Sequence, residues 1–232
     1  MSAFETENTP TTTSDSAVAA RAIVWAGGLT EQQKSDVLES TLFAQAAADK
    51  QHPPKSEGDT LQWYKTYQDT LGSIGWVVQA SAFTEVDYNQ TGGSVDDVVM
   101  QALATDSTVD KTLYASVARA LLSYSRAGDN SDAAKVFNES SIASTSEFAS
   151  FQIVVASSDG VNVLLTLYAF FYTSSETVKN TLWYSWTDET LSIKTSKLQM
   201  TLNPNIYGRV RILIHDKLRA ANKLNLIVPL CE

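Results

Sequence analysis

The pattern of apolar and polar positions is most regular at residues 161–172, which have the sequence VNVLLTLYAFFY. Strand side chains point alternately to opposite faces, and here both faces are apolar except at Asn162 and Thr166. A helix is the alternative, but the enrichment in Val, Thr, Tyr and Phe favours a strand. The run is also shorter than the about 20 apolar residues of a membrane-spanning helix. We therefore predict a central strand at residues 161–173 with both faces covered, since an exposed apolar face would forgo on the order of 10 kcal/mol.

Alternating apolar residues predict further strands at residues 148–157, 181–187 and 190–202, and a half-exposed antiparallel strand at residues 75–88. Turns are expected at residues 91–93, 157–160 and 187–189. Within residues 190–202 the apolar phase changes between Thr195 and Leu198. A strand of period two needs an extra residue for such a change, so we predict a β-bulge near Ser196 and Lys197.

Capping residues mark the predicted helices. Thr30 and Gln33 form a capping box that begins a helix ending near Gln51. Further helices are expected after Asp59 or Thr60, after Ser94, after Ser107 or Thr108, and after Ser131. The last helix begins at Asn203-Pro204. Its expected buried positions are Ile206, Val210, Leu213/Ile214, Lys217/Leu218 and Ala221.

The predicted fold class is α+β, with a largely antiparallel sheet layered between N-terminal helices and a basic C-terminal helix. Residues 1–16 are polar and are expected to form a flexible N-terminal arm. Residues 17–232 are expected to form a single α+β domain, which opens with an Ala-rich apolar segment at residues 17–26. Residues 224–230 alternate again and are expected to form an edge strand that tolerates Pro229.

Composition excludes several classes of protein. The chain has 232 residues, 44% hydrophobic and 19% charged, as in an ordinary globular protein. Its net charge of −9 argues against nucleic acid as a partner. The single cysteine, Cys231, excludes an intrachain disulfide. The N-terminal residues lack the pattern of a secretory signal, so we expect the protein in the cytoplasm, or released without a classical signal peptide.

Charge is unevenly distributed along the chain. Five of the 17 basic and two of the 26 acidic residues lie from Pro204 onward, so this segment carries +3 and the rest −12. Such asymmetry favours docking onto an anionic membrane or onto the acidic face of a second copy. A solvated helix with internal ion pairs is the alternative. The candidate contact residues are Arg209, Arg211, Lys217 and Arg219.

The densest aromatic cluster consists of Trp183, Tyr184 and Trp186. Trp and Tyr favour positions with one apolar and one wet side, so the cluster is a candidate contact with a partner or a membrane. Packing in the core is the alternative.

No motif for catalysis, metal or cofactor binding is present. His52 and His215 have no metal-ligand spacing around them, and neither a Walker loop nor a G-x-G-x-x-G motif occurs. Gly92-Gly93-Ser94 precedes a predicted helix, but Asp96 and Asp97 already occupy the field where an anion would bind. We therefore predict no cofactor, no metal and no catalytic residue.

Two classes of function follow. The first is a non-enzymatic protein that acts through its surface, by self-association or by binding a membrane. Its predicted plan, helices around long antiparallel strands, resembles that of Cyt-type cytolysins, which implies a pore-forming or toxin-like protein in which apolar strands meet lipid. The second is an enzyme or small-ligand binder with a pocket between sheet and helices, lined by Trp76, Tyr168 or Trp183.

Overall fold

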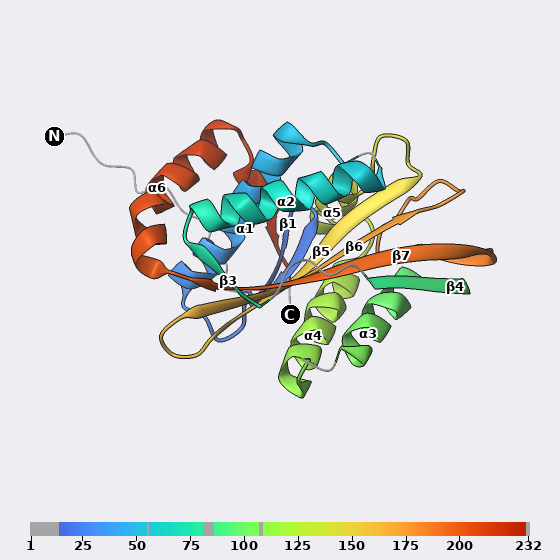
Figure 1. Cartoon of the computed structure of the whole chain (residues 1–232), viewed down its shortest axis with the longest axis horizontal. Coiled ribbons are helices and arrows are strands. Elements are labelled where there is room, and N and C mark those ends of the chain that lie inside the picture. The colour runs from blue at the N-terminus through green and yellow to red at the C-terminus, as the bar shows by residue number, and fades with distance from the viewer. Residues whose placement is uncertain (1–13, 55, 81–85, 107–108, 231–232) are drawn as a thin grey trace.

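The computed structural model describes residues 14–54, 56–80, 86–106 and 109–230. An eight-stranded mixed sheet lies between two layers of helices (Figure 1), which confirms the predicted α+β class. The strands are β1 (Ser16–Ala19), β2 (Ala22–Trp25), β3 (Trp76–Ala80), β4 (Val86–Ser94), β5 (Phe148–Ser158), β6 (Val163–Thr173), β7 (Ser185–Leu202) and β8 (Ile227–Pro229). The helices are α1 (Glu31–Gln51), α2 (Glu57–Ser73), α3 (Val95–Thr105), α4 (Lys111–Ala127), α5 (Asp132–Ser141), α6 (Pro204–Ala220) and the 3-10 helix η1 (Leu224–Leu226).

The sheet is built around three consecutive antiparallel strands. The strand order is β3-β7-β6-β5-β2-β1-β8, and β4 also pairs with β7. As predicted, β6 lies at the centre with apolar residues on both faces. Val161 and Asn162 are the exception, because they belong to the turn before β6, where the Asp159 carboxylate accepts both of their backbone N–H groups. Val161 is 80% exposed.

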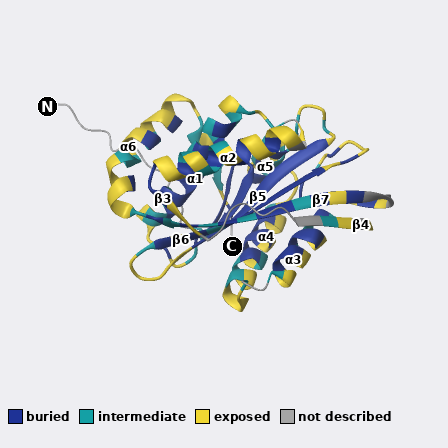
Figure 2. Cartoon of the chain, in the orientation of Figure 1, coloured by how far each residue is buried: buried dark blue, intermediate teal, exposed yellow. Residues whose placement is uncertain are grey.

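Two apolar cores lie on opposite faces of the sheet. Leu167 and Phe171 pack with α1, α2 and α6 in one core. Phe170 and Tyr168 pack with α3, α4 and α5 in the other, where the rings of Phe151 and Phe170 stack at 5.1 Å. Strands β1, β2, β5 and β6 are accordingly buried along most of their length (Figure 2). Leu164, at the bare end of β6 on the second face, is 37% exposed, and Val77 and Val78 of β3 are 48% and 40% exposed.

Strand β7 corrects two predictions. It continues through residues 187–189, where a turn was expected. Residues 181–184, which were predicted as the start of a strand, lie before β7 and are not part of it. It pairs with β6 from Ile193 to Leu202 without a register shift, so the bulge predicted at Ser196 and Lys197 is absent. Leu191 and Ile193 face the α3/α4/α5 core, whereas Leu198 faces the opposite core. The apolar residues of β7 therefore switch from one face of the strand to the other along its length. A sheet covered by helices on both faces permits this without a bulge.

The register does shift elsewhere, between Thr91 and Gly93 of β4 and between Val78 and Ala80 of β3. The predicted strand at residues 75–88 is thus two strands, with residues 81–85 outside the described part. Both pair antiparallel to β7, as expected. Residues 91–93, predicted as a loop, lie within β4.

The Ala-rich segment at residues 17–26 forms the β1–β2 hairpin, which the sequence pattern did not identify. Strand β2 pairs parallel to β5, so the sheet is mixed. Strand β8 pairs with β1 at the sheet edge and contains Pro229, as predicted. Ser16 is buried in β1 and belongs to the sheet rather than to the predicted arm, of which residues 1–13 lie outside the described residues.

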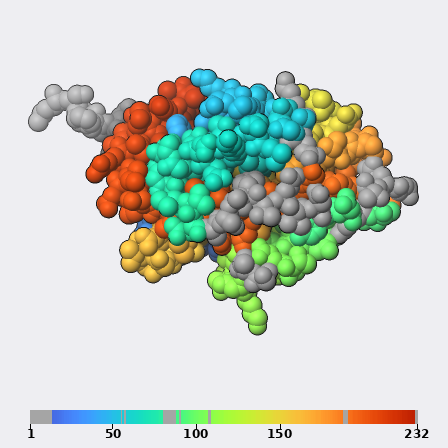
Figure 3. Space-filling view, viewed as in Figure 1, coloured from blue at the N-terminus to red at the C-terminus, as the bar shows by residue number. Residues whose placement is uncertain are grey.

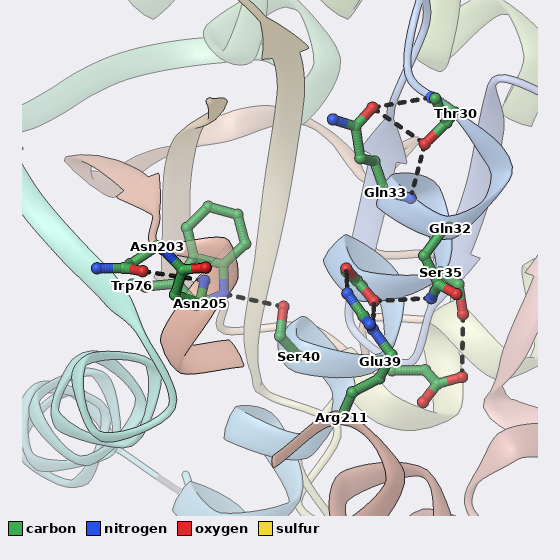
Figure 4. A network of polar contacts seen from close by, with 11 residues as sticks. Thr30, Gln32, Gln33, Ser35, Glu39, Ser40, Trp76, Asn203, Asn205 and Arg211 are labelled. Atoms are coloured by element: carbon green, nitrogen blue, oxygen red, sulfur yellow. Dashed lines mark hydrogen bonds and ion pairs between the residues drawn. The ribbon is translucent and has the colours of Figure 1, made fainter. Parts of the chain in front are cut away.

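Helix α1 begins with the predicted capping box of Thr30 and Gln33 (Figure 4). The side chains of Ser131 and Asn203 cap their helices as predicted, whereas Ser94 lies at the N-cap position of α3 without a side-chain capping bond. Helix α2 is instead capped by Ser56, because Thr60 already donates from within the helix to the Ser56 carbonyl. Helix α4 is capped by Asp110. The caps proposed at residues 107 and 108 lie outside the described residues.

Helix α6 confirms Ile214 and Leu218 as buried positions and corrects others, because Tyr207 is buried whereas Ile206, Leu213 and Ala221 are exposed. Gly75 allows the first turn of α6 to come close: it has φ of +111°, and a Cβ there would lie 3.1 Å from the Tyr207 backbone nitrogen. The first turn of α6 therefore approaches the chain before β3 closely, and Tyr207 turns into the core.

Candidate functional site

The outer face of α6 carries three large aliphatic side chains exposed to solvent. Ile206 is 45%, Ile212 75% and Leu213 54% exposed. The helix forms one end of the molecule (Figure 1), and its atoms fill that end of the visible surface (Figure 3). Exposed aliphatic residues are unremarkable when scattered singly, but a group on one helix indicates an interaction surface.

The inner face of α6 is tied to α1 by one ion pair and one further polar contact. The Arg211 guanidinium donates from Nε and Nη2 to the two carboxylate oxygens of Asp36, each at 2.7 Å. His215 Nδ1 lies 3.0 Å from Glu39 Oε1. Figure 4 shows Arg211 extending toward α1, close to Glu39. The hydrogen bond to Asp36 raises the pKa of Arg211 above its ordinary value. These contacts fix which side of α6 faces outward.

The predicted basic residues therefore divide into two groups. Arg211 is engaged within the chain by Asp36. Arg209, Lys217 and Arg219 are exposed. Arg219 pairs with Asp216 one turn earlier at 3.2 Å, and the Lys217 ammonium lies 5.8 Å from the centre of the Phe43 ring. We define the α6 outer face as Ile206, Arg209, Ile212, Leu213 and Lys217.

The aromatic cluster points inward. Tyr184 and Trp186 are buried in the α3/α4/α5 core, where their rings stack at 6.4 Å. Trp183 is half-buried and its ring lies 6.4 Å from that of Tyr124. The Tyr184 hydroxyl also hydrogen-bonds Ser174. In this structure these three residues contact their own chain, so their predicted role toward a partner stays a prediction.

The residues proposed for the alternative pocket are not brought together. Trp76 lies in the opposite core and donates from Nε1 to the Ser40 hydroxyl at 3.0 Å (Figure 4). Of the three proposed residues, Tyr168 is among those that line a pocket of about 260 Å³ between β7 and α3, and Trp76 and Trp183 are not part of its lining. There the Asp106 carboxylate accepts from the Tyr168 hydroxyl at 3.0 Å and from the Lys197 ammonium at 2.8 Å. Burial, and then the bond to Asp106, raises the pKa of Tyr168.

Sequence reasoning assigned the basic residues to this helix and left Leu213/Ile214 and Lys217/Leu218 as alternatives, but it placed Ile206 in the core. The signal that could have corrected it is the stripe of Tyr207, Ile214 and Leu218, which has helical spacing. With apolar residues at three consecutive positions, 212–214, periodicity alone does not choose the phase. The close approach at Gly75 decides it.

Within the described ranges, no group of three or more His, Cys, Asp or Glu side chains is placed to hold a metal ion. Among the helices of the described residues, none combines the length and apolar character needed to cross a bilayer.

No family model matches the chain, and no curated protein matches its sequence. Similar solved structures include a delta-endotoxin, at a TM-score of 0.40 and 10% identity over 79% of this chain and 81% of that one. The Evf virulence factor has a TM-score of 0.38 and 10% identity over 86% and 82% of the two chains. The activated Cyt2Ba monomer from Bacillus thuringiensis subsp. israelensis has a TM-score of 0.38 and 12% identity over 79% of this chain and 97% of that one. Likeness at this level concerns architecture and not function.

Proposed function

We propose that this protein binds anionic membrane surfaces through the α6 outer face, without catalysing a reaction. One observation carries the proposal: three exposed aliphatic side chains lie among basic side chains on one helix of an acidic protein. Burying apolar surface and neutralising anionic headgroups are the two interactions that hold a peripheral helix on a bilayer.

The magnitudes are those of reversible binding. A large aliphatic side chain gains about 1.5–3 kcal/mol when it is buried completely, and each basic residue near an anionic surface adds about 1 kcal/mol. Ile206, Ile212 and Leu213 already bury part of their surface, so each gains less than the full amount. Together with Arg209 and Lys217, the gross gain is at most about 11 kcal/mol, and the cost of association is at least about 4 kcal/mol. The binding is therefore expected to be weaker than micromolar, for which about 8 kcal/mol is needed.

A second copy of the chain is the competing occupant. The chain outside the C-terminal segment carries −12 and could meet the basic side chains of α6 in a neighbouring molecule. A second copy offers Ile212 and Leu213 only the separate exposed apolar side chains of its own surface. A bilayer offers a continuous apolar layer together with anionic headgroups, which supports lipid as the occupant.

Co-sedimentation with lipid vesicles tests the proposal. The full chain is mixed with vesicles of phosphatidylcholine, with or without about one third phosphatidylserine, a fraction that gives a strongly negative surface. We expect binding to the anionic vesicles only. The double variant Ile212→Ser/Leu213→Ser should bind at least tenfold more weakly, because about 1.4 kcal/mol corresponds to tenfold.

Leu61 on α2 and Val161 in the turn before β6 provide the matched control. They are 41% and 80% exposed, and neither lies on a basic element, since α2 carries Glu57, Asp59, Lys65 and Asp69 and the turn carries Asp159. The variant Leu61→Ser/Val161→Ser should bind as the unmodified chain does. Equal loss in both double variants would contradict a role for α6. A mass that doubles with protein concentration, and falls in the α6 variant, would instead assign this face to self-association.

Pore formation is the stronger form of the same proposal. Strands β5, β6 and β7 contain 11, 11 and 18 residues, and a tilted strand crosses the hydrocarbon layer with about 9–11. Their apolar faces are now covered by helices. Release of a trapped dye from the anionic vesicles would accompany exposure of these strands to lipid. Binding without release limits the function to the membrane surface.

A further inference from the structure

A polar pocket of about 240 Å³ lies at the turn between β1 and β2, apart from the Tyr168 pocket and on elements that the proposed membrane surface does not use. Helix α1, the end of α5 and the segment after α6 form its walls. The lining residues are Ala20, Arg21, Leu42, Gln45, Ala46, Asp49, Glu139, Ser140, Lys223 and Leu226.

Arg21 forms the charged base of this pocket and is 5% exposed. Its Nη2 donates to Asp49 Oδ1 at 2.7 Å and its Nη1 to the Ser150 hydroxyl at 3.0 Å. The guanidinium lies 4.7 Å from the centre of the Trp63 ring, whose Nε1 donates to the same Asp49 oxygen at 2.7 Å. Arg21 Nε has no hydrogen-bond partner within the described part of the chain. A buried donor without a partner is uncommon and costly.

The turn that carries Arg21 is held in a fixed conformation. Ala20 has φ of +50°, a left-handed backbone that residues other than glycine rarely adopt. The Gln45 side chain accepts from the Arg21 backbone at 3.3 Å and donates to the Ala19 carbonyl at 3.1 Å. Because both side-chain ends are engaged, Gln45 binds the turn to α1. The Arg21 side chain is therefore held in place before any ligand binds.

Two opposite charges face the pocket without pairing. Lys223 is half-buried and Glu139 is exposed at the end of α5. Both line the same small pocket, yet neither has an ion-pair partner among the residues that the structure describes, including each other. With Arg21 and Asp49 included, the lining contains two positive and two negative side chains. A single ion of either sign would therefore meet a like charge.

We propose that this pocket binds a small zwitterion, in which an ammonium and an anionic oxygen group are joined by a short carbon linker. The anionic group faces Lys223 and Arg21, and the ammonium faces Glu139 and Asp49. Leu42, Ala46 and Leu226 contact the linker. Bridging the two unpaired charges satisfies both at once, which a neutral or singly charged molecule does not.

The pocket volume limits the ligand to a small molecule, since a water molecule occupies about 30 Å³ in the liquid. A free amino acid and a phosphoethanolamine group both have the required chemistry. The second also occurs as the headgroup of a membrane lipid. The two sources differ in the anionic group, carboxylate or phosphate, and in whether the ligand is free or part of a bilayer.

Titration calorimetry on the full chain tests the inference. Glycine and O-phosphoethanolamine are the zwitterionic probes, and inorganic phosphate and ethanolamine are the single-charge probes. We expect one zwitterion to bind at least about tenfold more tightly than either single-charge probe. Lys223→Met and Glu139→Gln should each weaken that binding about tenfold, the effect of losing one charge-assisted hydrogen bond. Lys179→Met and Glu147→Gln, at exposed positions outside the pocket, should leave it unchanged.

The inference is overturned if no zwitterion binds at up to about 10 mM, an affinity too weak for a specific site. It is equally overturned if phosphate alone binds as well as phosphoethanolamine, or if the pocket variants bind like the controls. If the pocket prefers phosphoethanolamine, and the protein is also retained on vesicles that contain phosphatidylethanolamine, the ligand is a lipid headgroup. If the pocket prefers glycine, the ligand is a free amino acid. The Ile212→Ser/Leu213→Ser variant should bind the soluble probes normally, so this test is independent of membrane binding.

Discussion

Replacing Asp36 by Asn tests how α6 is held on the body of the protein. Asp36 is 5% exposed and accepts two hydrogen bonds of 2.7 Å from Arg211. Removing one partner of a buried ion pair costs about 3–5 kcal/mol. The Arg211 side chain is 34% exposed, so water hydrates part of the charge that is left. We therefore expect Asp36→Asn to lower the free energy of unfolding by about 2 kcal/mol.

Urea denaturation of the single variants, and of the double variant with Arg211→Met, measures the coupling between the two residues. We expect a coupling energy of about 1–2 kcal/mol. Asp69→Asn, an exposed position on α2, is the control and should change stability by less than about 0.5 kcal/mol. A loss in Asp36→Asn as small as that in the control would refute the account of how α6 is oriented.

Three further outcomes are expected from the fold. Phe171→Ala should cost about 3–5 kcal/mol in urea denaturation, whereas Leu164→Ala, at the bare end of the same strand, should cost under about 1.5 kcal/mol. Gly75→Ala should lower the melting temperature, because φ there is +111° and the methyl group would crowd Tyr207; an unchanged melting temperature would contradict this. Burial raises the pKa of Tyr67 and Tyr207. The folded state therefore holds these protons longer, so stability should fall as the pH rises above about 10, and a flat profile would contradict this.

Local patterns predicted the parts of the fold that depend on local chemistry. The capping box of Thr30 and Gln33 and the start of α6 at Asn203 need only neighbouring residues, and both are present. The two apolar faces of β6 predicted a sheet covered on both sides. That inference holds because no water-facing strand contains so many large apolar side chains.

Features that depend on distant parts of the chain could not be predicted in this way. The β1–β2 hairpin consists of two four-residue strands whose place in the sheet is set by pairing with β5, more than 100 residues later. In β7 the first half directs its apolar side chains into one core and the second half into the other. Which core each half contacts is a property of the tertiary packing. The same pattern in isolation is indistinguishable from a bulge.

The candidate surface was predicted in part for the same reason. The charge of α6 is a property of composition, and Arg209, Lys217 and Arg219 are exposed, with Leu218 rather than Lys217 buried in its turn. Which aliphatic residues accompany them depends on how α6 packs against the rest of the chain, including the close approach at Gly75, which lies outside the helix. The polar pocket left no pattern at all, since Arg21, Glu139 and Lys223 are far apart in the sequence and meet only in the folded chain.

Depth-dependent fluorescence quenching tests the central claim most directly. A polarity-sensitive label is attached at Leu213→Cys, or at Leu61→Cys as the control, with Cys231 replaced by Ser. Anionic vesicles contain lipids with a spin label in the acyl chain. We predict strong quenching of the label at position 213 and none at position 61. Equal quenching at both positions, or quenching at 61 alone, would contradict binding of the membrane through α6.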